Sequence, residues 1–150
     1  MRIWQAICGS CCSVLLLSAC DRVAAGAPAG ANPLSSHGAW ARTADSGATA
    51  AVYFVLTNAA DVADTLKGVT SAVAGSTGMH MSMQHSGMMQ MAPVTALPVP
   101  AEDSVAFQPL GAHVMLTGLR RALLEGDTVP VTLEFGSGRK IEVRASVRRP

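Results

Sequence analysis

The chain has 150 residues and a formal net charge of +1, with 14% charged and only 4% aromatic residues. This length fits one domain of ordinary size. The nearly balanced charge argues against a nucleic-acid partner, because such proteins need a basic stripe to replace counterions. With so few aromatic residues, the core is expected to consist of Val, Leu and Ala.

The first twenty residues have the order of regions found in a secretory signal. Arg2 precedes an apolar run that includes 14–17 and is too short to span a bilayer as a permanent helix. The segment ends in Leu17-Ser18-Ala19-Cys20, which resembles the lipobox cleaved in bacterial lipoproteins. The resemblance implies a signal peptide at 1–19 and a lipid on Cys20, which would anchor the protein on the periplasmic side of the cell envelope. An ordinary signal peptide with a chance cysteine is the alternative.

Cysteine usage agrees with removal of this segment. All four cysteines fall within it, so a mature lipoprotein would keep only Cys20. A metal cluster or disulfide built from Cys8, Cys11 and Cys12 would be lost with the signal peptide. An extracytoplasmic domain without disulfides must be held by its core. Asp21 resembles the signal that keeps some lipoproteins in the inner membrane, so that membrane is favoured.

The remainder divides into a tether and a domain. Residues 20–36 are rich in Ala, Gly and Pro and are expected to be flexible. Residues 37–150 contain short runs of strand-forming residues separated by turn residues such as 58–61 and 136–138. Strands are predicted at 49–57, 65–69, 94–99, 104–107, 112–116, 128–135 and 140–147. Many short strands with turn signals favour a single all-β domain, either a sandwich or a small Greek-key barrel.

Six of the eight methionines lie between Met79 and Met91. The pattern of residues 78–93 predicts a hairpin whose arms flank a turn at 85–87, with Gly87 supplying a positive φ. His80 would then lie on one arm and Met91 on the other, in a register that the sequence leaves open.

A second His/Met pair follows farther along the chain. His113 and Met115 are two residues apart, so on a strand they project from the same face. Thioethers are soft, neutral donors that prefer Cu(I), and imidazole adds a stronger nitrogen donor. Zinc usually recruits thiolates or carboxylates beside imidazole, and neither segment contains one.

Methionine is also a flexible core filler, so packing is an alternative explanation for several of these residues. A Met-rich arm also fits an apolar contact surface, which leaves an Ig-like protein-interaction module as an alternative function. The residues that fit packing or an auxiliary metal-binding role are Met79, Met81, Met83, His85, Met88 and Met89.

The spacing of four residues resembles the motif of the PCuAC family of periplasmic copper chaperones. That motif is His, ten residues, Met, twenty-one residues, then His-x-Met, and His80, Met91, His113 and Met115 reproduce each interval. Segments 38–42, 53–58 and 123–130 also resemble the family, so that the resemblance covers about residues 38–147.

The resemblance implies a cupredoxin-like β-barrel that binds one Cu(I) per chain through these four side chains. They are expected at the rim of the domain, outside the Val/Leu core. It also implies a chaperone that delivers copper to the copper centre of a respiratory oxidase, through an oxidase subunit or a Sco-type thiol protein. No nucleophile–base pair or carboxylate dyad can be assigned in the sequence, so the protein is expected to be non-enzymatic, and a monomer is expected. A copper-sequestering envelope protein is the alternative. The extra donors Met81, His85, Met88 and Met89 leave a stoichiometry above one open.

Overall fold

The computed structural model describes residues 32–85 and 87–149. The predicted signal peptide at 1–19, the lipidated Cys20 and the tether as far as residue 31 lie outside the described residues. The described part is built from strands, which confirms the all-β prediction. Among these residues, no helix has the length and apolar character needed to cross a membrane.

Ten strands of the described residues form one sheet in the order β5-β4-β8-β7-β2-β1-β10-β9-β3-β6, with an additional pairing of β8 with β2. Most neighbours are antiparallel, whereas β1 pairs with β10, and β7 with β8, in parallel. The strand bounds are β1 Leu34–Arg42, β2 Ala50–Asn58, β3 Asp64–Thr70, β4 Ala74–His85, β5 Met88–Val94, β6 Leu97–Val99, β7 Asp103–Phe107, β8 Ala112–Leu119, β9 Thr128–Phe135 and β10 Lys140–Arg148.

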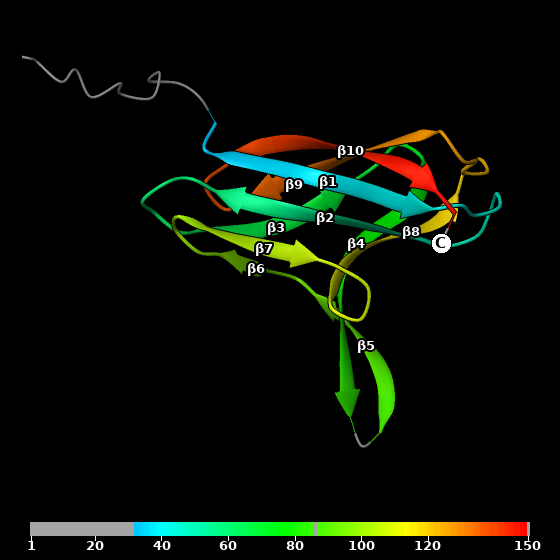
Figure 1. Cartoon of the computed structure of the whole chain (residues 1–150), viewed down its shortest axis with the longest axis horizontal. Coiled ribbons are helices and arrows are strands. Elements are labelled where there is room, and N and C mark those ends of the chain that lie inside the picture. Colours follow the sequence, from blue (N-terminus) through cyan, green and yellow to red (C-terminus); the bar gives the residue numbers. More distant parts are fainter. Residues whose placement is uncertain (1–31, 86, 150) are drawn as a thin grey trace, which may run out of the picture. The chain divides into compact units, whose positions relative to one another are not determined.

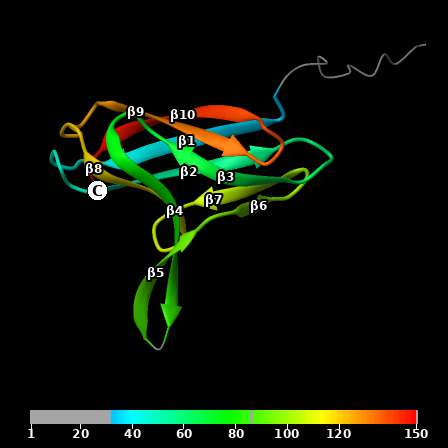
Figure 2. The same ribbon diagram turned by 180° about the vertical axis from the view of Figure 1, so that it is seen from behind.

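The sheet folds back on itself into two layers. Strands β1, β2 and β10 lie nearer the viewer in Figure 1, whereas β3, β4 and β9 lie nearer in the view from behind (Figure 2). The apolar side chains between the layers are mostly Val, Leu and Ala, as the composition predicted, but the core also contains Tyr53, Phe54, Phe107 and Phe135. The largest of those that are fully buried are Phe54, Leu56, Leu66, Leu116, Leu123, Leu133, Val52, Val99, Val114, Val129, Val131 and Val143.

The C-terminal hairpin follows its sequence pattern closely. Val143, Ala145 and Val147 of β10 are buried, and the residues between them are exposed, as strand alternation requires. The predicted turn at 136–138 joins β9 to β10, with Gly138 at a φ of 83°.

Asp64 accepts hydrogen bonds from Ser137 in this turn. Burial raises the pKa of Asp64, but these hydrogen bonds and the nearby Arg139 outweigh it and leave the pKa lowered.

The prediction of one strand at 94–99 is wrong. The chain leaves β5 after Val94 and enters β6 at Leu97, so this segment supplies both edges of the sheet. Val94 pairs with Met79 of β4, whereas Leu97 pairs with Leu66 of β3. Proline lacks a backbone donor and therefore fits edge strands, which is where Pro98 lies.

The predicted boundary of the tether at Ser36 also needs correction. Strand β1 begins at Leu34, which is 4% exposed and pairs with Asn58 of β2. Within β1 the register shifts between His37 and Trp40, where Gly38 adopts a φ of 64°. A glycine with positive φ at such a bulge lets the strand bend. This bulge masks the alternation of β1, so the strand was not visible in the sequence.

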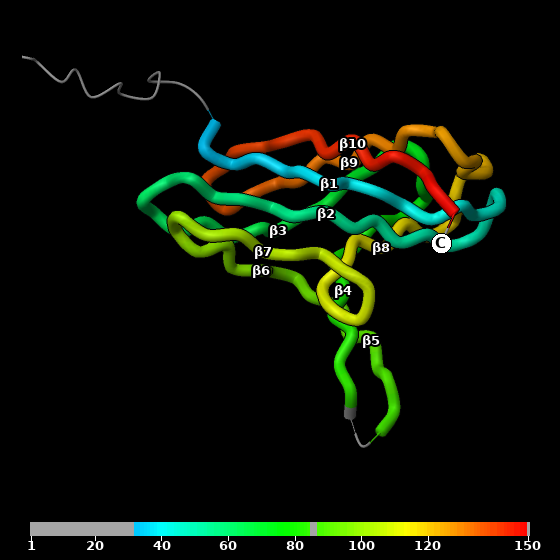
Figure 3. Tube along the Cα trace, viewed as in Figure 1, coloured from blue at the N-terminus to red at the C-terminus, as the bar shows by residue number. Residues whose placement is uncertain are grey.

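The β4–β5 hairpin extends away from the other strands, as the Cα trace shows (Figure 3). Its arms pair from Met79↔Val94 to His85↔Met88, which confirms the predicted hairpin. Gly87 has a φ of 80°, the positive value expected for this turn. The hairpin therefore carries its methionine-rich sequence beyond the two layers of the core.

Candidate metal centre

Three of the predicted ligands lie on β4 and β8, which are neighbours in the sheet. His80 is directly opposite His113, and Gly78 is directly opposite Met115. Residues paired across antiparallel strands, and residues two apart along one strand, share a face of the sheet. His80, His113 and Met115 therefore share one face. A Cβ on Gly78 would lie 3.5 Å from Nε2 of His80, so the glycine leaves space between His80 and Met115.

The fourth predicted ligand, Met91, lies on the edge strand β5. It is directly opposite Ser82, which is two residues from His80 along β4. Met91 thus shares the face of the other three side chains and is the diagonal neighbour of His80. Diagonal neighbours are within reach of long side chains, as a methionine has.

The four residues differ in burial. Met91 is 59% exposed, whereas His113 is only 4% exposed. The prediction that all four ligands lie at the rim, outside the core, is therefore wrong for His113. The reason is that β8 lies between β4 and β7 and also pairs with β2, so it is an interior strand.

The two imidazoles are close and oriented differently. Their ring centroids are 6.0 Å apart, with an interplanar angle of 70°. Nδ1 of His113 lies 3.0 Å from the carbonyl oxygen of Gly111. A carbonyl can only accept, so Nδ1 carries a proton, and in the neutral ring Nε2 then keeps its lone pair. Histidine ligands are commonly fixed by such a hydrogen bond from the second nitrogen. This hydrogen bond leaves Nε2 as the nitrogen through which the neutral ring of His113 would bind a metal.

His80 shows a different feature. Its Nδ1 is buried and finds no hydrogen-bond partner among the described residues. An unpartnered buried polar atom is unfavourable, and such exceptions need a physical reason. The other ring nitrogen, Nε2, lies toward Gly78, whose cross-strand partner is Met115. A metal ion bound at Nδ1 would give this atom the partner that the described residues do not supply.

A cavity of about 440 Å³ opens at this face. Met91, His113 and Met115 line it, together with Tyr53 and Leu110, whereas His80 is not part of its wall. Leu110 is 76% exposed and has a φ of 66°, which is uncommon for a residue other than glycine. This strained residue at the wall of the cavity was not predicted from the sequence.

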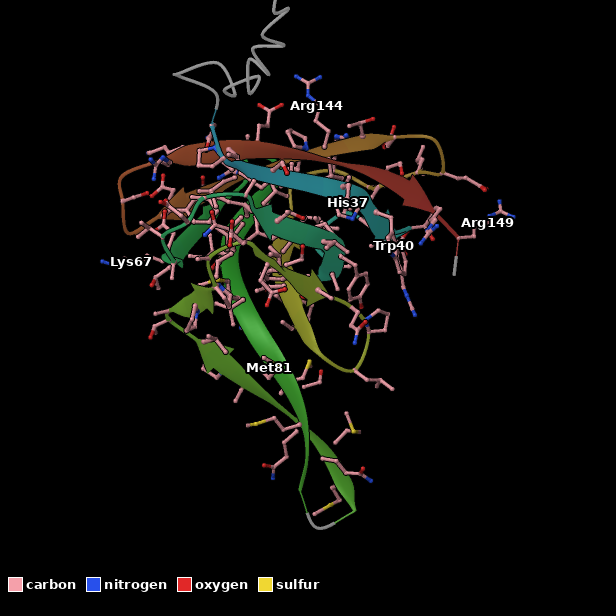
Figure 4. All side chains as sticks on the ribbon, turned by 60° about the vertical axis from the view of Figure 1, so that its left-hand side comes forward. His37, Trp40, Lys67, Met81, Arg144 and Arg149 are labelled. Atoms are coloured by element: carbon pink, nitrogen blue, oxygen red, sulfur yellow. The ribbon has the colours of Figure 1, made fainter. Side chains whose placement is uncertain are left out.

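Aromatic residues from two further strands support the site, and sequence reasoning missed their role. The chain's single tyrosine, Tyr53, has its ring centroid 6.4 Å from that of His113. Trp40 packs on Tyr53 with centroids 4.6 Å apart, and the guanidinium of Arg148 lies 4.0 Å above the Trp40 ring. Figure 4 labels Trp40 on β1, close to the C-terminal end of β10. The sequence signal for Trp40 and Tyr53 was their place in segments 38–42 and 53–58, which resemble the family.

The auxiliary residues divide between the two faces of the hairpin. Met89 is opposite Gln84 and so shares the face of His80 and Met91. The other three methionines occupy the opposite face by strand alternation: Met81, Met83 and Met88. His85 is the last residue of β4. Met79 is 5% exposed and belongs to the core, as its packing interpretation predicted.

The donor set at this face consists of two imidazoles and two thioethers. In the part of the chain that the structure describes, no three His, Cys, Asp or Glu side chains form a group that could hold a metal ion. Thioether and imidazole donors suit a soft monovalent ion, and a neutral set leaves the ion with its own single charge. The residues present therefore fit Cu(I).

Comparisons with known proteins identify the family and the fold of the chain. Residues 34–147 match the family described as "Putative lipoprotein LpqE-like". "Putative lipoprotein Lxx21020" of Leifsonia xyli subsp. xyli (strain CTCB07) is 32% identical over 111 residues, which cover 73% of this chain. The chain spans 66% of that relative's length.

Two solved structures with bound copper share the fold. The copper-bound PCuAC domain from PmoF2 has a TM-score of 0.65 and 26% identity, with 79% of this chain and 94% of that domain covered. The Cu(I) form of DR1885 from Deinococcus radiodurans has a TM-score of 0.56 and 35% identity, with 81% and 83% covered. These matches confirm the resemblance to the PCuAC family and its fold. The chain belongs to the LpqE-like lipoprotein family, and its β-domain is of the PCuAC type.

Proposed function

We propose that this domain binds one Cu(I) through His80, Met91, His113 and Met115 and acts as a copper chaperone. The observation that carries the proposal is that the strand register brings all four side chains to one face, with the two histidines directly opposite each other. The copper-bound PCuAC domain from PmoF2 and the Cu(I) form of DR1885 support the choice of metal.

The gradient of exposure across the site suits transfer of the ion. Met91 is exposed on an edge strand, whereas His113 is buried and fixed by Gly111. A partner's soft donor could replace Met91 first while the histidines still hold the ion. Copper would then pass between the proteins by stepwise ligand exchange and never be free in solution. No bond in a substrate is made or broken, so the proposed role is non-enzymatic.

We further propose that the recipient is a respiratory oxidase, reached through an oxidase subunit or a Sco-type thiol protein. Deleting the gene is expected to lower oxidase activity at limiting copper, with recovery on copper supplementation. Complementation with the wild-type gene should restore oxidase activity. Complementation with a gene that carries both His113→Ala and Met115→Leu should not. Met83→Leu, on the opposite face of the hairpin, is the matched control and should restore it. Normal oxidase activity combined with greater sensitivity to toxic copper would instead indicate sequestration.

The proposed anchor is a lipid on Cys20, with the domain held at the periplasmic side of the inner membrane. The names of the family and of the relative from Leifsonia xyli support a lipoprotein. We expect Cys20→Ser to abolish lipidation, and mass spectrometry of the mature N-terminus to find a lipid on Cys20 in the wild type. Cys12→Ser is the control and should leave the lipid in place, because Cys12 would be removed with the signal peptide. An unmodified wild-type N-terminus would rule out the anchor.

A further inference from the structure

Several methionines of the β4–β5 hairpin take no part in the site described above and are not buried. Met83 is 52% exposed and Met88 is 65% exposed. Packing in the core therefore does not explain Met83 and Met88, although it explains Met79, and Met81 is partly buried against the core. Large apolar side chains on a protein surface are unremarkable singly, but here they gather on one two-stranded hairpin. Figure 4 shows sulfur atoms on both sides of this hairpin, with Met81 near its base.

The register places three of these thioethers on the face that the His/Met site does not use. Met83 is opposite Gln90, and Met88 is opposite His85, so Met83 and Met88 are diagonal neighbours. Met81 precedes Met83 by two residues and shares its face. Diagonal neighbours are about 7–8 Å apart, a distance that long side chains can bridge. Methionine has three rotatable bonds, so the sulfurs of Met83 and Met88 can converge on one point, with Met81 next along the same face.

The chemistry of this face is that of a soft monovalent cation site. Thioethers carry no charge and prefer Cu(I) to harder ions. We propose that Met81, Met83 and Met88 form a second, weaker site for a soft monovalent cation, Cu(I) in the cell. It is weaker than the first site because none of its three donors is buried and pre-oriented as His113 is. Met83 and Met88 are exposed, so an ion bound there exchanges readily with the surroundings.

The test is a titration with Ag(I), a soft monovalent ion, followed by NMR of methionine methyl groups labelled with carbon-13. In the wild type, we expect the methyl signals of Met91 and Met115 to shift with the first equivalent. Those of Met83 and Met88 should shift with a second equivalent. The variant Met83→Leu, Met88→Leu removes two sulfurs and conserves volume, so it should bind only the first equivalent.

Met89→Leu is the matched control, because Met89 is also exposed on the hairpin but lies on the other face. It should retain the second equivalent. Saturation of the wild type at one equivalent, or two equivalents in the double leucine variant, would overturn the second site. If Met83 and Met88 shift while Met91 and Met115 do not, this inference stands and the proposed four-residue site fails.

Discussion

Replacing His113 and Met115 together, as His113→Ala and Met115→Leu, is expected to weaken Cu(I) binding by about a hundredfold or more, or ~3 kcal/mol. The two residues contribute an imidazole and a thioether from the same face of β8. His113 is also the donor whose orientation is fixed before the ion binds, through the carbonyl of Gly111. Losing a pre-oriented ligand lowers the binding free energy more than losing a mobile one. Without it, the ion must be held by side chains that lose conformational freedom when they bind.

The measurement is competition against a Cu(I) chelator under anaerobic conditions. Met83→Leu is the control for the loss of a thioether, because it lies on the opposite face, and should keep the affinity of the first equivalent. Since His113 is buried, circular dichroism and urea unfolding must show that the variant is folded. Met91→Leu gives an independent arm, since Met91 is exposed and its replacement leaves the core untouched. Wild-type affinity in the folded His113/Met115 variant would refute the ligand assignment.

The second large effect concerns the stability of the domain. We expect Phe54→Ala to lower the free energy of unfolding by roughly 3–5 kcal/mol, the usual cost of removing a buried phenylalanine. Phe54 is 2% exposed and stacks on Phe107 with ring centroids 4.3 Å apart. The two residues are direct cross-strand partners and hold β7 against β2. The loss is a large share of the roughly 5–15 kcal/mol that stabilises most domains.

Urea unfolding measures this change as a lower midpoint at an unchanged slope. Leu124→Ala is the matched control, because Leu124 is a large apolar residue that is 65% exposed. Its effect should stay within about 0.5 kcal/mol, as for most surface substitutions. A Phe54→Ala variant as stable as the control would show that the stacked pair does not hold the two strands together.

Local patterns in the sequence were sufficient for most of the strands and for the donor chemistry. Alternation along β10 gave its buried face, and Gly87 and Gly138 marked two turns because these positions need a positive φ. The interval between His113 and Met115 gave their common face, since the side-chain period of a strand is two residues. These features depend on neighbours within a few positions, which a sequence displays directly.

Other features depended on which strands pair, and the tertiary structure decided them. The segment 94–99 looks like one strand, yet its two halves pair with strands at opposite edges of the sheet. The pairing of His80 with His113 joins residues far apart in the chain, and their register is set by the β4–β8 ladder. Burial of His113 follows from β8 being an interior strand. The chemical identity of the ligand side chains, which the sequence alone gives, determined which ion they suit. Long-range strand pairing decided how deeply each ligand is buried, because burial depends on what packs against a strand and not on the residues of that strand.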